Sequence, residues 1–118
     1  MNFYIVIPAH NESDAIGLTL YSLSQQTLKP KRIVVVNDNS TDKTESVVDG
    51  FTQRHDFISL IIATSSDKHL PGSKIIHAFN KGLEILNENF DVICKFDADL
   101  IFPKNYLEAM ESCGYKLI

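Results

Sequence analysis

Two aspartates one residue apart, Asp97 and Asp99, are the residues of this sequence best suited to do chemistry. They follow an apolar run typical of a buried strand, and apolar residues rather than a helix start come after them. Two carboxylates this close repel each other at neutral pH, and a divalent cation relieves the repulsion. Carboxylate oxygens suit a hard ion such as Mg²⁺ or Mn²⁺. The pair therefore predicts a metal site that could hold a diphosphate.

Polar residues also follow two earlier predicted strands. Pro8-Ala9-His10-Asn11-Glu12 comes after the first strand, and Asn37-Asp38-Asn39-Ser40 comes after the second. Ligands of open α/β sheets bind beyond the carboxyl ends of the strands, so these segments and the aspartate pair are expected to share one edge. The structural alternative is helix capping, which we favour for Ser13 and for Ser40 to Asp42.

Hydrophobic periodicity predicts the elements that must position these residues. The expected strands are 3–8, 32–37, 57–64 and 91–97. The expected helices are 13–26, one that follows residues 40–42 and carries Val47, Val48 and Phe51, one over 73–86, and one starting near Pro103. Pro8 is expected to end the first strand, and Asp42 with Glu45 to form a capping box. The strands are continuously apolar rather than alternating, which favours an α/β fold with a mostly parallel four-stranded sheet and helices on both faces.

Composition and charge narrow the choice of partners. The 118 residues are 44% hydrophobic and 22% charged, which fits one domain with its own core and excludes a disordered chain. Eleven basic and 15 acidic residues give a net charge of −4, so nucleic acid is not expected as a partner. A ligand with phosphate groups must then be held locally, by the backbone, one or two lysines, or a metal.

The start of the chain and the cysteines predict a cytoplasmic protein. The first residues lack the basic start and the length of a signal peptide, and no stretch approaches the length of a membrane span. Cys94 and Cys113 are expected to be free thiols in a reducing compartment.

Together these segments resemble the successive motifs of family 2 glycosyltransferases of the GT-A fold, which implies a Rossmann-like nucleotide-binding half. The resemblance runs over roughly residues 3 to 108, in the family's order and approximate spacing. The matching segments are Pro8 to Glu12, Asn37 to Asp42, Gly72-Ser73-Lys74, Asn80-Lys81-Gly82 and Phe96 to Asp99. Each piece alone is common, but the combination is highly specific.

The resemblance implies that the polar strand ends bind a nucleotide-sugar, a UDP-sugar foremost. Ala9 and His10 would line the base pocket together with Pro8, and Glu12 would hydrogen-bond the ribose. Asp38 would read the edge of the nucleobase, expected to be uracil.

The resemblance also implies how the diphosphate is held. Asp99 would ligate Mn²⁺ or Mg²⁺, and Asp97 would face the ribose or the water shell of the metal, with Ala98 between them. Lys74 could reach the phosphates. The metal would act as a Lewis acid when the nucleoside diphosphate leaves the sugar.

For the whole protein, the resemblance implies sugar transfer to a hydroxyl of a glycan or lipid-linked acceptor, in the synthesis of glycans, cell walls or cell-surface polysaccharides. Family members continue well past the D-x-D motif, so we expect residues 1–118 to be the N-terminal nucleotide-sugar-binding portion of a longer transferase. The acceptor site and the general base would lie in the missing part, and this chain alone is expected to bind nucleotide weakly without transferring sugar. We also expect a homodimer or a loosely ordered C-terminus, and a full-length protein that is peripheral to the inner face of the membrane.

Two other functions stay open. One is a half-domain that binds nucleotide without turnover. The other is an aspartyl-nucleophile phosphatase, in which Asp97 would attack phosphorus and Asp99 would act as acid and base. Such enzymes usually have Gly-Thr directly after the second aspartate, whereas Leu100-Ile101 follow here. Their motif also follows the first strand, whereas here it follows the fourth predicted strand. Transfer from a UDP-sugar would separate the leading function from the first alternative, and phosphate release from a monoester would favour the second.

Overall fold

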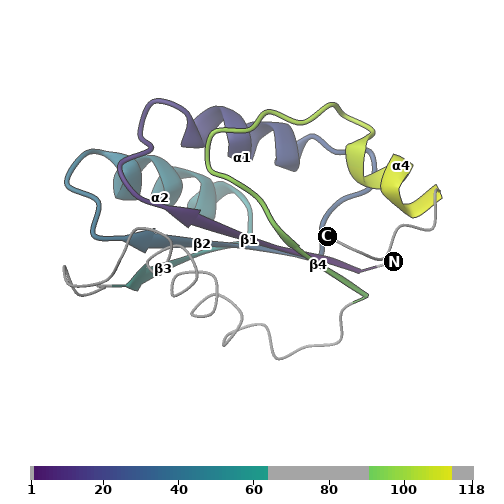
Figure 1. Cartoon of the computed structure of the whole chain (residues 1–118), viewed down its shortest axis with the longest axis horizontal. Helices are drawn as coiled ribbons and strands as arrows, with labels where there is room; N and C mark the ends of the chain where they lie inside the picture. The colour runs from purple at the N-terminus through teal and green to yellow at the C-terminus, as the bar shows by residue number, and fades with distance from the viewer. Residues whose placement is uncertain (1, 64–90, 113–118) are drawn as a thin grey trace.

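Four parallel strands form one sheet in the order β3-β2-β1-β4 (Figure 1). The structure is a computed structural model that describes residues 2–63 and 91–112. Its elements are β1 (Phe3–Ala9), α1 (Ile16–Ser24), β2 (Arg32–Asp38), α2 (Thr44–Arg54), β3 (Ile58–Ala63), β4 (Val92–Lys95) and α4 (Tyr106–Ser112). The predicted parallel α/β sheet is confirmed, while the helix expected over 73–86 lies outside the described residues.

The strand order reverses next to β1, the strand in which Ile5 lies between Ile33 of β2 and Cys94 of β4. From β1 the chain moves outward to β2 and then β3, and β4 afterwards pairs with the other side of β1. Such a reversal is the place where open α/β sheets bind ligands, beyond the carboxyl ends of the strands. The topology therefore puts the segments after β1 and β4 at the ligand-binding position of the fold.

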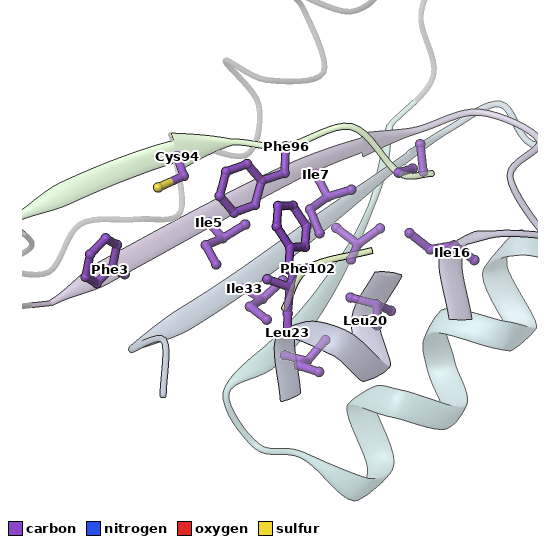
Figure 2. Close-up of a cluster of buried hydrophobic side chains, with 14 of the residues drawn as sticks. Phe3, Ile5, Ile7, Ile16, Leu20, Leu23, Ile33, Cys94, Phe96 and Phe102 are labelled. Carbon is purple, nitrogen blue, oxygen red and sulfur yellow. The ribbon is translucent and has the colours of Figure 1, made fainter. Parts of the chain in front are cut away.

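The sheet is buried on both faces, which explains its continuous apolar runs. Successive side chains of a strand point to opposite faces, and in β1 both sets are buried. Phe3, Ile5 and Ile7 pack with residues of α1 and α2, which lie on the same side of the sheet (Figures 1 and 2). Tyr4 and Val6 pack on the other face with residues of β2. Replacing a fully buried α1 residue such as Leu20 by alanine should cost about 2–5 kcal/mol of stability.

Pro8 does not end β1, as predicted, but lies inside it opposite Val36 of β2. The pairing of β1 with β4 stops two residues earlier, at Val6 opposite Lys95. Because proline has no N–H to donate, it is tolerated where a strand has lost its neighbour on one side. Pro8 thus stands where β1 continues after its pairing with β4 has ended.

Helix α1 begins later than the sequence predicts, and the N-cap of α2 differs from the predicted one. The Glu12 carbonyl accepts hydrogen bonds from the amides of Ala15 and Ile16, so residues 12–15 form a turn and α1 starts at Ile16 rather than Ser13. The N-cap of α2 is Lys43, which makes no side-chain cap hydrogen bond, so the predicted capping box of Asp42 with Glu45 is wrong.

The boundaries around the aspartate pair also shift. β4 ends at Lys95 rather than Asp97, and α4 begins at Tyr106, three residues after Pro103. The D-x-D segment therefore belongs to an irregular stretch between β4 and α4. β3 spans Ile58–Ala63, one residue shorter at each end than expected.

Cys94 is a buried free thiol on β4, as expected. Burial raises the pKa of this thiol to about 12, so it stays protonated at neutral pH and serves in packing. Cys113 lies outside the described residues. In the part of the chain that the structure describes, the helices fall short of the length and hydrophobicity that crossing a membrane requires.

Candidate functional site

A hydrogen bond from His10 joins the end of β1 to the end of β2. His10 Nδ1 lies 2.6 Å from the carbonyl oxygen of Asp38. Because a carbonyl oxygen can only accept, Nδ1 is the donor in this bond, which leaves Nε2 as the second ring nitrogen. Asn11 Nδ2 lies 3.5 Å from that Nε2 atom. The imidazole is therefore oriented from both sides, although the residue itself is exposed.

Asn11 connects the loop after β1 to the loop after β2. Its φ of 52° is in the left-handed region, which asparagine tolerates better than most residues. Its backbone N–H donates to Ser40 Oγ at 3.0 Å, and its side-chain Oδ1 accepts from the amides of Thr41 at 2.7 Å and Asp42 at 3.3 Å. The joining of the two loops by Asn11 was not predicted from the sequence. The only signal for this role was an asparagine that comes just before the pattern of a helix start.

Asp42 links the same two loops through its carboxylate. It accepts hydrogen bonds from the amide and hydroxyl of Thr44 and, at 3.2 Å, from the amide of Ser13. Thr44 Oγ1 in turn accepts from the amide of Glu12 at 2.9 Å. The capping predicted for Asp42 is therefore confirmed in part, because its carboxylate accepts from the first amide of α2. The capping predicted for Ser13 is wrong, because the N-cap of α1 is Ala15, which forms no side-chain hydrogen bond.

The hydrogen bonds to Asp42, that from the Thr44 hydroxyl foremost, hold the pKa of this carboxyl well below its usual value near 3.8. A depressed pKa means that the ionised carboxylate stabilises the fold. This contribution is fully present above about pH 4 and is lost as the pH falls toward the lowered pKa of Asp42. The loop junction is thus intact at neutral pH.

Glu12 lies within electrostatic reach of the aspartate pair. Burial raises the pKa of Glu12, and the negative charges of Asp99, Asp42 and Asp97 raise it further, while His10 lowers it. These charges act on Glu12 because the fold brings the segment after β4 near the segment after β1. Glu12 and the D-x-D pair therefore lie close enough for their charges to interact.

The D-x-D segment alternates between the core and solvent. Phe96 and Ala98 are buried, whereas Asp97 and Asp99 are exposed. Lys95 Nζ lies 3.9 Å from Asp97 Oδ1, and the Asp97 side chain is 70% exposed, so this ion pair contributes little to stability. The buried pair anchors the segment, and both carboxylates are left at the surface.

The donor chemistry of this segment fits a magnesium or manganese ion. Among the described residues, no group of three or more His, Cys, Asp or Glu side chains forms a metal site on its own. Mg²⁺ usually binds one or two carboxylates and completes its shell with water and phosphate oxygens. Exposed Asp97 and Asp99, with a third carboxylate at Glu12 that they repel, match that requirement.

The other predicted residues that the structure describes lie at the same edge. Pro8 is half-buried, and Ala9 is buried at the end of β1 opposite Asn37. Asp38 is the last residue of β2 and is also buried. Lys74 lies outside the described residues.

Comparison with known proteins points to one family. The family described as "Glycosyl transferase family 2" matches residues 4–111. The probable glycosyltransferase YdaM of Bacillus subtilis is 38% identical over 97 residues, which cover 80% of this chain and 22% of YdaM. The amylovoran biosynthesis glycosyltransferase AmsB of Erwinia amylovora is 30% identical over 108 residues, which cover 92% of this chain and 34% of AmsB. The chain thus spans about a fifth to a third of the length of these relatives.

Solved structures share the fold. S. aureus TarS 1-349 in complex with UDP superposes with a TM-score of 0.75 at 24% identity, covering 95% of this chain and 31% of TarS. The mannosyltransferase PcManGT from Pyrobaculum calidifontis, in complex with GDP-Man and Mn²⁺, superposes with a TM-score of 0.66 at 25% identity, covering 86% of this chain and 28% of that protein.

Proposed function

This chain belongs to glycosyl transferase family 2, and we propose that it binds the nucleoside diphosphate of a sugar donor through a divalent cation held by Asp97 and Asp99. The observation that carries the proposal is the pair of exposed carboxylates anchored by buried Phe96 and Ala98 at the switch point of the sheet. TarS bound to UDP, and PcManGT bound to GDP-Man and Mn²⁺, support the ligand class.

The nucleoside is proposed to lie over the ends of β1 and β2. Pro8, Ala9 and the oriented ring of His10 would line the base pocket. Asp38 would accept a hydrogen bond from the base, which the N3–H of uracil can donate. Guanine also offers N–H donors on its edge, so a GDP-sugar is the main competitor to a UDP-sugar.

The ribose and diphosphate would follow toward the D-x-D segment. Glu12 would hydrogen-bond the ribose, and its backbone is fixed for this by the bond from its amide to Thr44. Asp99 and Asp97 would supply oxygen ligands to Mn²⁺ or Mg²⁺, and Lys74 is proposed to reach the phosphates. When bound, the cation would neutralise charge on the diphosphate as a Lewis acid.

For the whole protein, we propose transfer of the sugar to a hydroxyl of a glycan or lipid-linked acceptor in polysaccharide synthesis. The name of AmsB, which refers to amylovoran biosynthesis, supports this class of product. No described residue is assigned as the general base. The family match over residues 4–111 favours this function over the phosphatase alternative.

A nucleotide titration tests the proposal. Thermal unfolding is measured with UDP, GDP, ADP and CDP, each with and without Mn²⁺. UDP with Mn²⁺ is expected to raise the Tm most, because the nucleotide that binds the folded chain most tightly stabilises it most. A ligand at 100 times its Kd adds about 2.7 kcal/mol to stability. GDP giving the larger metal-dependent shift would move the proposal to a GDP-sugar. If none of the four nucleotides gave a metal-dependent shift, the proposed function would be wrong.

A further inference from the structure

Of the four buried polar side chains on helix α1 and the two residues after it, three bind a segment that is distant in the sequence. Thr19, Ser22 and Gln26 are 0%, 7% and 2% exposed. Their spacing of three and four residues places them on one side of the helical turn. Burying such groups is unfavourable unless each finds a hydrogen-bond partner, and apolar residues could pack there without that requirement. Their partners therefore indicate what this side of α1 does.

Thr19 and Ser22 bind the backbone of the acidic segment. Thr19 Oγ1 donates to the carbonyl oxygen of Ala98 at 3.0 Å, in addition to a longer contact of 3.3 Å with the carbonyl of Ala15 in its own helix. Ser22 Oγ accepts from the amide of Phe102 at 3.0 Å. Both bonds join residues about 80 positions apart in the sequence, at separations of 79 and 80.

Gln26 binds the far end of the same segment. Its Nε2 donates to the carbonyl of Pro103 at 2.6 Å, and its Oε1 accepts from the amide of Leu107 at 3.0 Å. Leu107 lies in the first turn of α4, where backbone amides have no partner within the helix. The Thr27 amide adds a bond to the carbonyl of Lys104 at 2.8 Å. The start of α4 is therefore set from α1.

Apart from the Thr19 contact with Ala15, these bonds reach backbone atoms between Ala98 and the first turn of α4, and the carboxylates of Asp97 and Asp99 are left exposed. The Thr19 bond is the most consequential. The Ala98 carbonyl and the Asp99 amide belong to one planar peptide unit, so holding the carbonyl also orients the chain at Asp99. Simple satisfaction of buried groups would not require that the bonded peptide lie between the two aspartates.

We propose that Thr19, Ser22 and Gln26 are positioning residues, which hold the backbone from Ala98 to Leu107 and thereby set where Asp97 and Asp99 lie. The inference rests on the proposed function, because the consequence is the affinity for a cation with a diphosphate. The three side chains act through the backbone they bind and do not touch the ligand.

The test compares Thr19→Val with two matched variants in binding titrations of UDP with and without Mn²⁺. Thr19→Val keeps the shape and removes the hydroxyl, and it is expected to weaken Mn²⁺-dependent UDP binding about tenfold while leaving metal-free binding unchanged. Thr19→Ser restores the hydroxyl and should recover most of the affinity. Ser24→Ala is the control, because the Ser24 hydroxyl is buried on the same helix but donates to Tyr21 O.

Two results would overturn the inference when the wild-type chain binds. One is equal Mn²⁺-dependent affinity in Thr19→Val and wild type. The other is an equal loss in Thr19→Val and Ser24→Ala, which would indicate general destabilisation of α1.

A ligand-free measurement separates this inference from the proposed function. Backbone amide exchange over residues 98–105 is compared in wild type, Thr19→Val and Ser24→Ala. At least about tenfold faster exchange in Thr19→Val alone supports the positioning role even if wild type binds no UDP with Mn²⁺, in which case only the proposed function fails. Equal exchange in all three chains would overturn the positioning role. Should Thr19→Val not fold, Ser22→Ala replaces it in both measurements, with the same expectations.

Discussion

The two loop regions of the site are held in opposite ways. After β1 and β2, the side chains of Asn11, Asp42 and Thr44 bond to one another's loops and so shape them. After β4, the backbone is bonded by side chains of α1, and the aspartates themselves stay exposed.

The difference shows how a fold keeps carboxylates available for a ligand. The Asp42 carboxylate is committed to Thr44 and Ser13, and its pKa is held low by these bonds. Among the described residues, no hydrogen bond to the carboxylate of Asp99 is found, and this segment is held through its main chain by bonds such as that from Thr19 to the Ala98 carbonyl. A carboxylate that must bind a cation is best positioned by groups that do not occupy its oxygens.

The largest effect is expected at the available carboxylate. Asp99→Asn should weaken Mn²⁺-dependent UDP binding at least about thirtyfold, because it replaces an anionic oxygen ligand with a neutral amide. The Tm should change little, since Asp99 is exposed. Calorimetric titration measures the binding.

Asp56→Asn is the matched control, because Asp56 is an exposed aspartate just before the start of β3, at the opposite edge of the sheet. If Asp99→Asn bound UDP with Mn²⁺ as tightly as Asp56→Asn does, the contrast between committed and available carboxylates would have no functional meaning.

A smaller effect, on stability, is expected in the region shaped by its own side chains. Asn11→Ala should lower the free energy of unfolding by about 2 kcal/mol, through lost hydrogen bonds and a left-handed φ that alanine tolerates poorly. Asn11→Gly loses the same bonds without the backbone strain, so it should cost about 1 kcal/mol less. Urea unfolding of both variants measures the difference. A cost below about 0.5 kcal/mol for Asn11→Ala would mean that this junction does not hold the loops together.

The smallest effect is expected at Glu12, which belongs to the first region but is repelled by the acids of the second. Its pKa in the folded chain is raised, so the ionised form is disfavoured and stability falls as the pH rises through that pKa. Glu12→Gln should therefore raise the Tm by about 2 °C at pH 7.5 and leave it unchanged well below the pKa of Glu12. Thermal unfolding at both pH values checks this.

Glu45→Gln serves as the charge control. Glu45 lies in the first turn of α2, where a negative charge favours the helix dipole, so its removal should lower the Tm slightly. An unchanged or lower Tm for Glu12→Gln at pH 7.5 would contradict the repulsion between the two regions. The same variant should weaken binding of UDP with Mn²⁺ in the titrations above.

Much of the fold was predictable because burial on both faces leaves a local signature. The apolar runs around Ile5 and Val34 gave strands at nearly the observed positions. The errors fall at boundaries, where tertiary contacts compete with local signals. Pro8 stays within β1 because β4 has already ended beside it, and Asp42 bonds to Ser13 of another loop as well as to its own helix.

The candidate site was predictable only in the residues that follow strands. Glu12, Asp38 and the D-x-D pair could be proposed as site residues because polar residues directly after an apolar run mark a strand end. The roles of Asn11 and Thr19 were missed because their partners lie in other segments, and the sequence around each residue does not show which segments those are.

By itself, the sequence determined a parallel α/β sheet with carboxylates after its strands, since periodicity and polarity are local properties of the chain. Only the tertiary structure decided that β4 lies next to β1, which brings the charges of Asp97 and Asp99 to bear on Glu12. It also decided that α1 holds the acidic segment, through bonds such as that from Thr19 to Ala98. Contacts across such separations depend on how whole elements pack, and packing is a property of the assembled core rather than of any one stretch of sequence.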